Sequence, residues 1–358
     1  MTQKFRRGLV VGKFSPLHRG HDLVIQRALE ECHEVILLSY SNPEFQGCEA
    51  EKRIAWLAAL YPQAFRLVVT PELLRSLKPH HPKLPGSIPA NDAPDLEHRR
   101  FCGQLCQDVL RLTVDAVFTS EDYGDGFAEE LTRFFREKEP AATTVRHITV
   151  DRARTKIPVS GTLLRGDMHR HRELLPPEVY ASFVKRVCIL GGESTGKSTL
   201  AQELAKAFQT EYVAEYGREL WEAQEGILHF EDMLRIAETQ IERESSAACR
   251  ASEYLFCDTS PLTTLFYSHH MFGKACEELV RLAERRYDVT ALCLPDFPFV
   301  QDGTRQPSSF RDLQHQWYLA ELHRRNWPYV EVGGDVPNRI EQVRKYLARH
   351  AVCGLEHP

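Results

Sequence analysis

The chain has 358 residues, of which 42% are hydrophobic and 27% charged, and its formal net charge is −5. This composition is that of a soluble globular protein with enough apolar residues for two cores, and the acidic balance argues against a nucleic-acid partner bound through a broadly basic surface. The sequence contains no apolar run of signal or transmembrane length, and its ten cysteines form no C-x-x-C pair. We therefore expect a cytoplasmic protein with reduced thiols and no membrane span.

In the first half of the chain, short apolar segments alternate with amphipathic ones. This alternation predicts an α/β domain with a doubly wound parallel sheet, whose ligand lies beyond the carboxyl ends of the strands. Residues 71–94 hold six prolines and show no period, so we expect a long loop that covers the ligand. The expected strands are 8–12, 35–38, 66–69 and 114–118, and the expected helices are 23–32 and 52–60.

Two histidines follow the first expected strand, at the turn where the chain enters a helix. His18 and His21 stand there with Gly20 between them, and much later in the chain Ser160 is placed to cap a helix that carries Arg165. Backbone N–H groups at the start of a helix attract anions. Both stretches are therefore candidates for a phosphate-binding site.

Residues of these types suit the transfer of AMP from ATP to a phosphate oxygen. That nucleophile is already an anion, so the site must stabilise charge rather than remove a proton. His18 and His21 are candidate hydrogen-bond donors to the α-phosphate and the bridging oxygen. Arg165, together with Lys13, is a candidate for holding the β- and γ-phosphates.

The motifs His18-x-Gly20-His21 and Ser160-x-Thr162-x-x-Arg165 resemble the paired signature of the nucleotidyltransferase superfamily. Residues 12–16 are similar to the same segment of its nicotinamide mononucleotide adenylyltransferases. The resemblance implies a Rossmann-like nucleotidyltransferase domain over residues 1–180. The residues expected to bind nucleotide there are Gly12, Phe14, Ser15, Gly20, Ser120, Ser160 and Thr162.

The family often stacks a tryptophan on the nicotinamide ring, and this chain has no tryptophan between Trp56 and Trp221. Phe101 or Tyr123 is expected to take that place. Because that tryptophan is missing, the identity of the nucleotide that accepts AMP in the first domain stays open.

The second half is organised around a phosphate-loop motif at residues 191–199, which fits G-x-x-x-x-G-K-[ST]. An expected strand, 187–190, precedes it and an expected helix, 200–208, follows it, as such a loop requires. Lys197 is expected to lie along the β- and γ-phosphates, and the Ser198 hydroxyl to ligate Mg²⁺. The other loop residues expected to bind nucleotide are Gly191, Gly192, Glu193, Ser194, Thr195, Gly196 and Thr199.

Further expected strands, 211–215, 255–258 and 291–294, complete a second parallel sheet over residues 181–358. Asp258 ends one of them and is a candidate Mg²⁺ ligand opposite Ser198. Glu215 and Asp258 are both candidates to orient the attacking hydroxyl, and the sequence does not choose between them. The loop 302–311 carries Arg305 and Arg311, which we expect to close over ATP.

The order of these motifs, with residues 215–219, Asp258 and Arg305, resembles the kinase half of the NadR-type enzymes. Those are bifunctional proteins that phosphorylate ribosylnicotinamide and then transfer AMP from ATP to nicotinamide mononucleotide, giving NAD and pyrophosphate. Tyr216 or Trp221 would offer an aromatic face to the pyridinium ring.

Two alternatives stay open at this point. The chain keeps the kinase but has a first domain that is inactive or uses another acceptor, or it is a nucleotide-sensing regulator. Some relatives carry a DNA-binding helix-turn-helix in front, and because this chain reaches its first expected strand by Leu9, we expect it to lack that module. The expected partners are therefore small nucleotides and not nucleic acid, and a homo-oligomer is left open.

Overall fold

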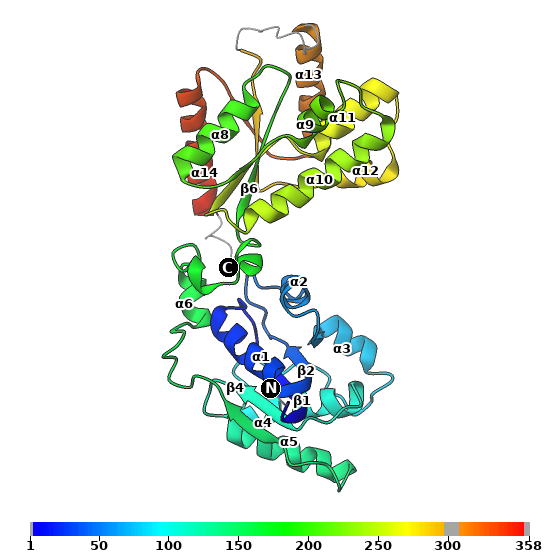
Figure 1. The fold of residues 1–358 in the computed structure, drawn as a ribbon, viewed down its shortest axis with the longest axis vertical. Coiled ribbons are helices and arrows are strands. Elements are labelled where there is room, and N and C mark those ends of the chain that lie inside the picture. Colours follow the sequence, from blue (N-terminus) through cyan, green and yellow to red (C-terminus); the bar gives the residue numbers. More distant parts are fainter. Residues whose placement is uncertain (1–2, 297–307, 354–358) are drawn as a thin grey trace. The chain divides into compact units, whose positions relative to one another are not determined.

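The computed structural model describes residues 3–296 and 308–353. The chain divides into two compact units, residues 1–182 (unit 1) and residues 183–358 (unit 2). Each unit is built around one five-stranded parallel sheet (Figure 1). No helix in the described part of the chain is long and apolar enough to cross a membrane.

The sheet of unit 1 has the strand order β3-β2-β1-β4-β5, and every neighbouring pair is parallel. Strands β2 and β3 therefore follow β1 on one side of it, and β4 and β5 lie on its other side. This reversal of strand order places a crevice at the carboxyl ends of β1 and β4. The elements of unit 1 are β1 (Phe5–Val11), α1 (Arg19–Glu31), β2 (Cys32–Ser39), α2 (Ala50–Leu60), β3 (Phe65–Val68), α3 (Pro71–Leu77), α4 (Asp95–Gln104), a π-helical turn η1 (Leu105–Val109), β4 (Ala116–Thr119), α5 (Gly124–Lys138), β5 (Arg146–Thr149), α6 (Gly161–Gly166), a 3₁₀ turn η2 (Arg172–Leu174) and α7 (Pro177–Tyr180).

The sheet of unit 2 has the strand order β10-β9-β6-β8-β7 and is also parallel throughout. The strand that leads into the phosphate loop, β6, is its central strand. The elements of unit 2 are β6 (Lys185–Gly191), α8 (Lys197–Phe208), β7 (Tyr212–Val213), α9 (Tyr216–Ala223), α10 (Phe230–Ala248), β8 (Tyr254–Asp258), α11 (Pro261–Phe272), α12 (Glu277–Leu282), β9 (Val289–Cys293), α13 (Ser308–Arg324), β10 (Val330–Val332) and α14 (Val336–Cys353).

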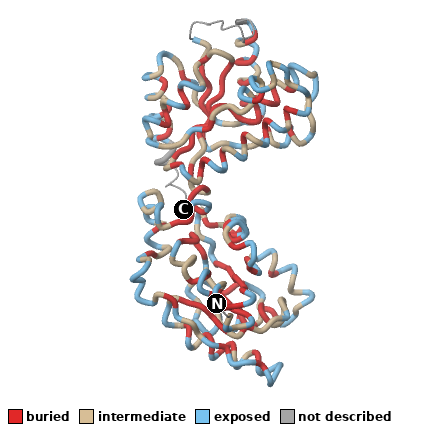
Figure 2. The backbone as a smooth tube through the Cα atoms, viewed as in Figure 1, coloured by how far each residue is buried: buried red, intermediate tan, exposed pale blue. Residues whose placement is uncertain are grey.

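Strand β6 shows why residues 187–190 are apolar at four successive positions. Successive side chains of a strand point to opposite faces, and helices cover both faces of a parallel sheet. Val187 and Ile189 accordingly belong to a core formed with α8 and α14, and Cys188 and Leu190 to a second core formed with α10, α11 and α13. In both units the central strands are buried, while the helices keep exposed outer faces (Figure 2).

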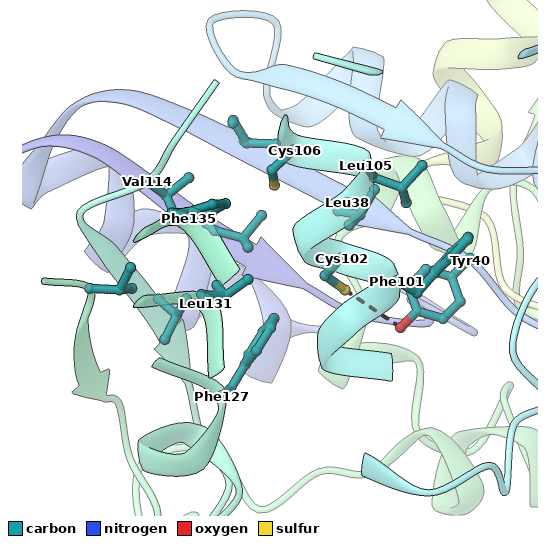
Figure 3. Close-up of a cluster of buried hydrophobic side chains, with 14 of the residues drawn as sticks. Leu38, Tyr40, Phe101, Cys102, Leu105, Cys106, Val114, Phe127, Leu131 and Phe135 are labelled. Atoms are coloured by element: carbon teal, nitrogen blue, oxygen red, sulfur yellow. Dashed lines mark hydrogen bonds between the residues drawn. The ribbon is translucent and has the colours of Figure 1, made fainter. Parts of the chain in front are cut away.

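In unit 1 the principal core packs α4 and α5 against the sheet (Figure 3). Cys102 and Cys106 lie in this core and are buried, and both share one side of the α4–η1 segment with Phe101 and Leu105. The Tyr40 hydroxyl lies 3.6 Å from the Cys102 sulfur.

Some local expectations were wrong. Residues 71–77 form α3 rather than loop, because Thr70 caps the helix by accepting the Leu73 N–H at 3.1 Å and Pro71 suits the first helical turn. Strands β5 and β10 were also missed. Other expectations are confirmed: Asp258 ends β8, and the Ser160 hydroxyl caps α6 by accepting the Leu163 N–H at 3.2 Å.

Candidate active sites in the two units

A cavity of about 670 Å³ opens at the carboxyl ends of β1 and β4 in unit 1. This is the switch point of the sheet, where ligands bind in open parallel sheets. All eleven residues that the sequence predicts to be catalytic or to bind nucleotide in this unit line the cavity. They are Gly12, Lys13, Phe14, Ser15, His18, Gly20, His21, Ser120, Ser160, Thr162 and Arg165.

The two histidines form a reciprocal cap at the start of α1. The His21 N–H donates to His18 Nδ1 and the His18 N–H donates to His21 Nδ1, both at 3.3 Å, and the rings stack with centroids 3.6 Å apart. Since each Nδ1 accepts a hydrogen bond, we assign the proton of each neutral ring to Nε2. The cap therefore leaves two Nε2–H donors on rings that line the cavity.

Burial keeps both rings uncharged at neutral pH. Burial lowers the pKa of His18 to about 4, with a smaller effect of Arg154. Burial also holds the pKa of His21 well below its usual range, assisted by His18 and Arg154. The pair is thus suited to donate hydrogen bonds to phosphate oxygens and not to act as a charged acid.

Gly20 is required by the close approach of the two motifs. A Cβ at this position would lie 2.9 Å from Val159 Cγ1 and 3.1 Å from His18 Nδ1. The Val159 side chain therefore packs closely on Gly20. Because Val159 directly precedes the cap of α6, this packing joins the histidine turn to the segment that carries Ser160 and Arg165.

Two cations predicted from the sequence face the cavity. The Arg165 guanidinium donates to the Ser15 carbonyl, lies 3.3 Å from Thr162 Oγ1 and stacks 4.1 Å from the centre of the Phe45 ring. The Lys13 ammonium donates to the Asn91 carbonyl at 3.1 Å, and burial, followed by the nearby Arg165, lowers its pKa. Positive charge is therefore concentrated beside the histidines.

Of the two aromatic residues expected at the acceptor, Phe101 and Tyr123, only the second lines the cavity. Phe101 is 1% exposed, packs edge-on against Tyr40 and does not line the cavity, because its side of α4 faces the core (Figure 3). Tyr123 does line it, as do Tyr40 and Phe45, which the sequence analysis missed.

In unit 2 the phosphate loop joins β6 to α8, as predicted. Gly191 has φ +149°, and a Cβ there would lie 2.7 Å from Thr195 Oγ1, so only glycine fits. The Thr195 hydroxyl donates to the Gly192 carbonyl at 2.8 Å, and the Lys197 ammonium donates to the same oxygen at 2.9 Å. Lys197 thus lies back over the loop at the N-terminus of α8.

Two acids lie within electrostatic range of Lys197. Burial raises the pKa of Asp258, while Lys197 and a hydrogen bond from Ser198 act in the opposite direction. Burial raises the pKa of Glu215 to about 7, with Lys197 opposing and Asp258 adding to the shift. The structure therefore brings together Lys197, Ser198, Glu215 and Asp258.

The donor set at Asp258 fits Mg²⁺. Its Oδ1 atom is buried and has no hydrogen-bond partner among residues 3–296 and 308–353. A buried carboxylate oxygen without a partner is costly, and carboxylate and hydroxyl oxygens are ligands that Mg²⁺ prefers.

The raised pKa of Glu215 makes stability depend on pH. The folded chain binds this proton more tightly than the unfolded chain, whose carboxyl has the ordinary pKa of 4.5. The free energy of unfolding should therefore fall as pH rises from about 4.5 through 7. We expect Glu215→Gln to stabilise unit 2 by about 3 kcal/mol at pH 8, measured by chemical unfolding without nucleotide or metal. The exposed Glu238→Gln is the matched control, and equal stability of both variants at pH 8 would contradict the prediction.

Three residues form a closed set of hydrogen bonds around the loop, and the sequence analysis singled out only one of them. The Glu193 N–H donates to Gln314 Oε1 at 2.7 Å, Gln314 Nε2 donates to the Tyr267 hydroxyl at 3.1 Å, and that hydroxyl donates to Glu193 Oε1 at 2.9 Å. Gln314 lies on α13 and Tyr267 on α11. These bonds tie the phosphate loop to two helices that follow it far along the chain.

Arg339 of α14 is a second residue that the sequence analysis missed. It is fully buried, and its guanidinium donates to the carbonyls of Thr195 at 2.6 Å, Gly334 at 2.9 Å and Leu294 at 3.3 Å. Asp296 pairs with its charge. No local pattern marks Arg339, because its partners come from three other segments.

Of the remaining predicted residues, Arg305 lies outside the described residues, as do Asp302 and Gly303. Arg311 lies against the phosphate loop, since a Cβ on Gly192 would be 2.6 Å from its carbonyl oxygen.

The two aromatic residues predicted for substrate have other contacts. The Arg243 guanidinium covers one face of the Tyr216 ring at 4.5 Å, and the Trp221 indole packs on the turn at Gly226. A role for either in substrate binding stays a prediction.

Comparisons with known proteins agree with this arrangement. Residues 186–339 match a family model described as an AAA domain. The chain is 28% identical over 339 residues to the "Trifunctional NAD biosynthesis/regulator protein NadR" of Escherichia coli K12, covering 92% of this chain and 79% of that protein. It is also 28% identical over 327 residues to the protein of the same name from Salmonella typhimurium LT2, covering 89% and 76%.

Two solved structures share the fold. "NadR protein in complex with NR" matches with a TM-score of 0.65 at 19% identity, and "NadR protein in complex with NAD and AMP-PNP" with 0.64 at 20% identity, each covering 96% of both chains. The chain is therefore a NadR-like protein, by sequence over about nine tenths of its length and by fold over nearly all of it.

Proposed function

We propose that this chain is a bifunctional enzyme that makes NAD from ribosylnicotinamide in two steps. Unit 2 transfers the γ-phosphoryl group of ATP to ribosylnicotinamide, giving nicotinamide mononucleotide, and unit 1 transfers AMP from a second ATP to that product, giving NAD and pyrophosphate. The observation that carries the proposal is the presence of two separate turns, each between a central parallel strand and the N-terminus of a helix, a place where backbone N–H groups favour anions. The NAD biosynthesis named for the NadR relatives, and the ligands bound in the two NadR structures, support it.

In unit 1 the chemistry requires charge stabilisation. The phosphate of nicotinamide mononucleotide attacks the α-phosphorus of ATP, the bond to the bridging oxygen breaks, and pyrophosphate leaves with its electron pair. The uncharged His18 and His21 rings donate from Nε2 to the α-phosphate and the bridging oxygen, while Arg165 and Lys13 hold the leaving phosphates.

In unit 2 alignment matters most, because phosphoryl transfer has a loose transition state. Nucleotide binding replaces the bond from Lys197 to the Gly192 carbonyl with bonds to the β- and γ-phosphates. Glu215, whose pKa is about 7, is the better candidate to accept the proton of the ribose hydroxyl. Asp258 has a buried, unpartnered oxygen and is the candidate ligand of Mg²⁺ instead. Mg²⁺ held by Ser198 and Asp258 would supply positive charge to the phosphates.

Two labelled forms of ATP test the proposal in the intact chain supplied with ribosylnicotinamide. With the γ-phosphate labelled, we expect label in both the mononucleotide and the dinucleotide; with the α-phosphate labelled, we expect it only in the dinucleotide. Labelled mononucleotide without any α-labelled dinucleotide would mean that unit 1 is inactive or uses another acceptor. Absence of both products would leave a nucleotide-sensing regulator as the remaining explanation. A salt-dependent mobility shift of promoter DNA by the protein would test that alternative.

A further inference from the structure

Arg154 also lines the unit 1 cavity and belongs to neither of the two motifs. Arg154 lies between β5 and α6, and its guanidinium donates to the Val159 carbonyl at 3.4 Å and to Glu121 Oε1 at 3.3 Å. Val159 is the residue whose side chain packs against Gly20. Arg154 also lowers the pKa of both histidines by its charge, after burial. Its guanidinium therefore lies beside the histidine turn.

The backbone that carries Arg154 is held by one carboxylate. Asp151 accepts hydrogen bonds from the N–H groups of Thr155, Lys156 and Ile157 at 3.0 to 3.3 Å, and from the Thr155 hydroxyl at 3.1 Å. The Asp151 carboxylate is therefore hydrogen-bonded by the backbone of its own turn. Glu121 is consequently the carboxylate that faces the Arg154 guanidinium.

The ion pair between Arg154 and Glu121 is weak enough for a phosphate to replace the carboxylate. The side chains are 44% and 53% exposed, and exposed ion pairs contribute only about 0.2 to 1 kcal/mol. A guanidinium binds phosphate oxygens through two parallel charge-assisted hydrogen bonds, so a polyphosphate carrying several charges competes well with a single carboxylate. The charge of Glu121 also acts on Lys13, raising its pKa against the effect of burial, so this carboxylate interacts electrostatically with two cations of the site.

We infer that Arg154 is a further binding residue for the polyphosphate of ATP in the unit 1 cavity, and that Glu121 holds its guanidinium until nucleotide binds. The inference rests on the proposed function of unit 1. It assigns a third cation to the β- and γ-phosphates, one that neither sequence motif contains.

Arg152 offers a matched control for the test. It lies two residues away, pairs with an exposed carboxylate, Asp122, and does not line the cavity. We expect Arg154→Gln to raise KM for ATP in adenylyl transfer, and KM for pyrophosphate in the reverse reaction, by about 10- to 100-fold. Arg152→Gln should change neither KM by more than about twofold. Glu121→Gln should lower KM for ATP, because the competing carboxylate is removed.

Unchanged KM values in Arg154→Gln, or equal losses in Arg154→Gln and Arg152→Gln, would overturn the inference while the proposed function stands. If the chain makes no dinucleotide, ATP and pyrophosphate are titrated by calorimetry into Lys197→Ala with and without Arg154→Gln. Weaker binding in the double variant supports the inference without the proposed reaction. Equal binding, or no binding to either protein, overturns it.

Discussion

Replacing His21 with alanine is expected to lower the kcat of adenylyl transfer by about 100- to 1,000-fold, the usual loss when one donor to a developing charge is removed. His21 is partly buried, is uncharged at neutral pH, and carries its proton on Nε2 because Nδ1 accepts the His18 N–H. NAD formation from nicotinamide mononucleotide and ATP measures the effect.

His21→Asn separates the chemistry from the helix cap. An asparagine oxygen can accept the His18 N–H in place of Nδ1, but it leaves no donor at the position of Nε2. A full rate in His21→Asn would show that His21 only caps α1. Lys197→Ala is the reciprocal variant, expected to abolish phosphorylation of ribosylnicotinamide and to spare adenylyl transfer.

Replacing Arg339 with methionine is expected to destabilise unit 2 by about 3 to 5 kcal/mol, because three carbonyls lose the donor that the buried guanidinium gives them, and an unsatisfied buried group costs about 1 to 3 kcal/mol. The substitution removes this donor from the carbonyls of Thr195, Gly334 and Leu294, whereas Asp296, which is 37% exposed, keeps the Gly334 N–H. Because Thr195 belongs to the phosphate loop, ATP affinity at this unit should fall as well. Chemical unfolding and ATP titration measure the two effects.

The control for this variant lies on the same helix. Lys345 is 67% exposed and pairs only loosely with Glu341, at 3.7 Å. Lys345→Met should change the free energy of unfolding by no more than about 0.5 kcal/mol. A loss below 1 kcal/mol in Arg339→Met would mean that the carbonyls find water or other donors, and would refute the role given to Arg339.

The site residues predicted from the sequence are those that belong to short local motifs. His18 and His21 are three residues apart, and the phosphate loop lies within nine residues, so a single strand-to-helix turn determines their arrangement. Asp258 was predictable for a related reason: a strand's carboxyl end can be located from its apolar run, and parallel strands meet their ligand there.

Residues that act through distant partners could not be predicted in this way. Arg154 is one of many arginines in the sequence until Val159 and Glu121 are seen beside it, and Gln314 has no pattern of its own on α13. The aromatic prediction failed for Phe101 because helical spacing does not say which side of α4 faces the sheet. The helix α3 was missed because its cap, Thr70, was outweighed by the prolines that follow.

The tie between Arg339 and the phosphate loop also bears on how the chain matures on the ribosome. Domains tend to fold as they emerge, the amino-terminal one first. The cavity of unit 1 needs no residue beyond Arg165, so it can form while unit 2 is still being translated. The phosphate loop after β6 emerges near the middle of synthesis, but the Arg339 guanidinium that binds its Thr195 carbonyl comes from α14, near the end of the chain. We therefore expect the capacity to bind ATP at unit 2 to arise late in translation.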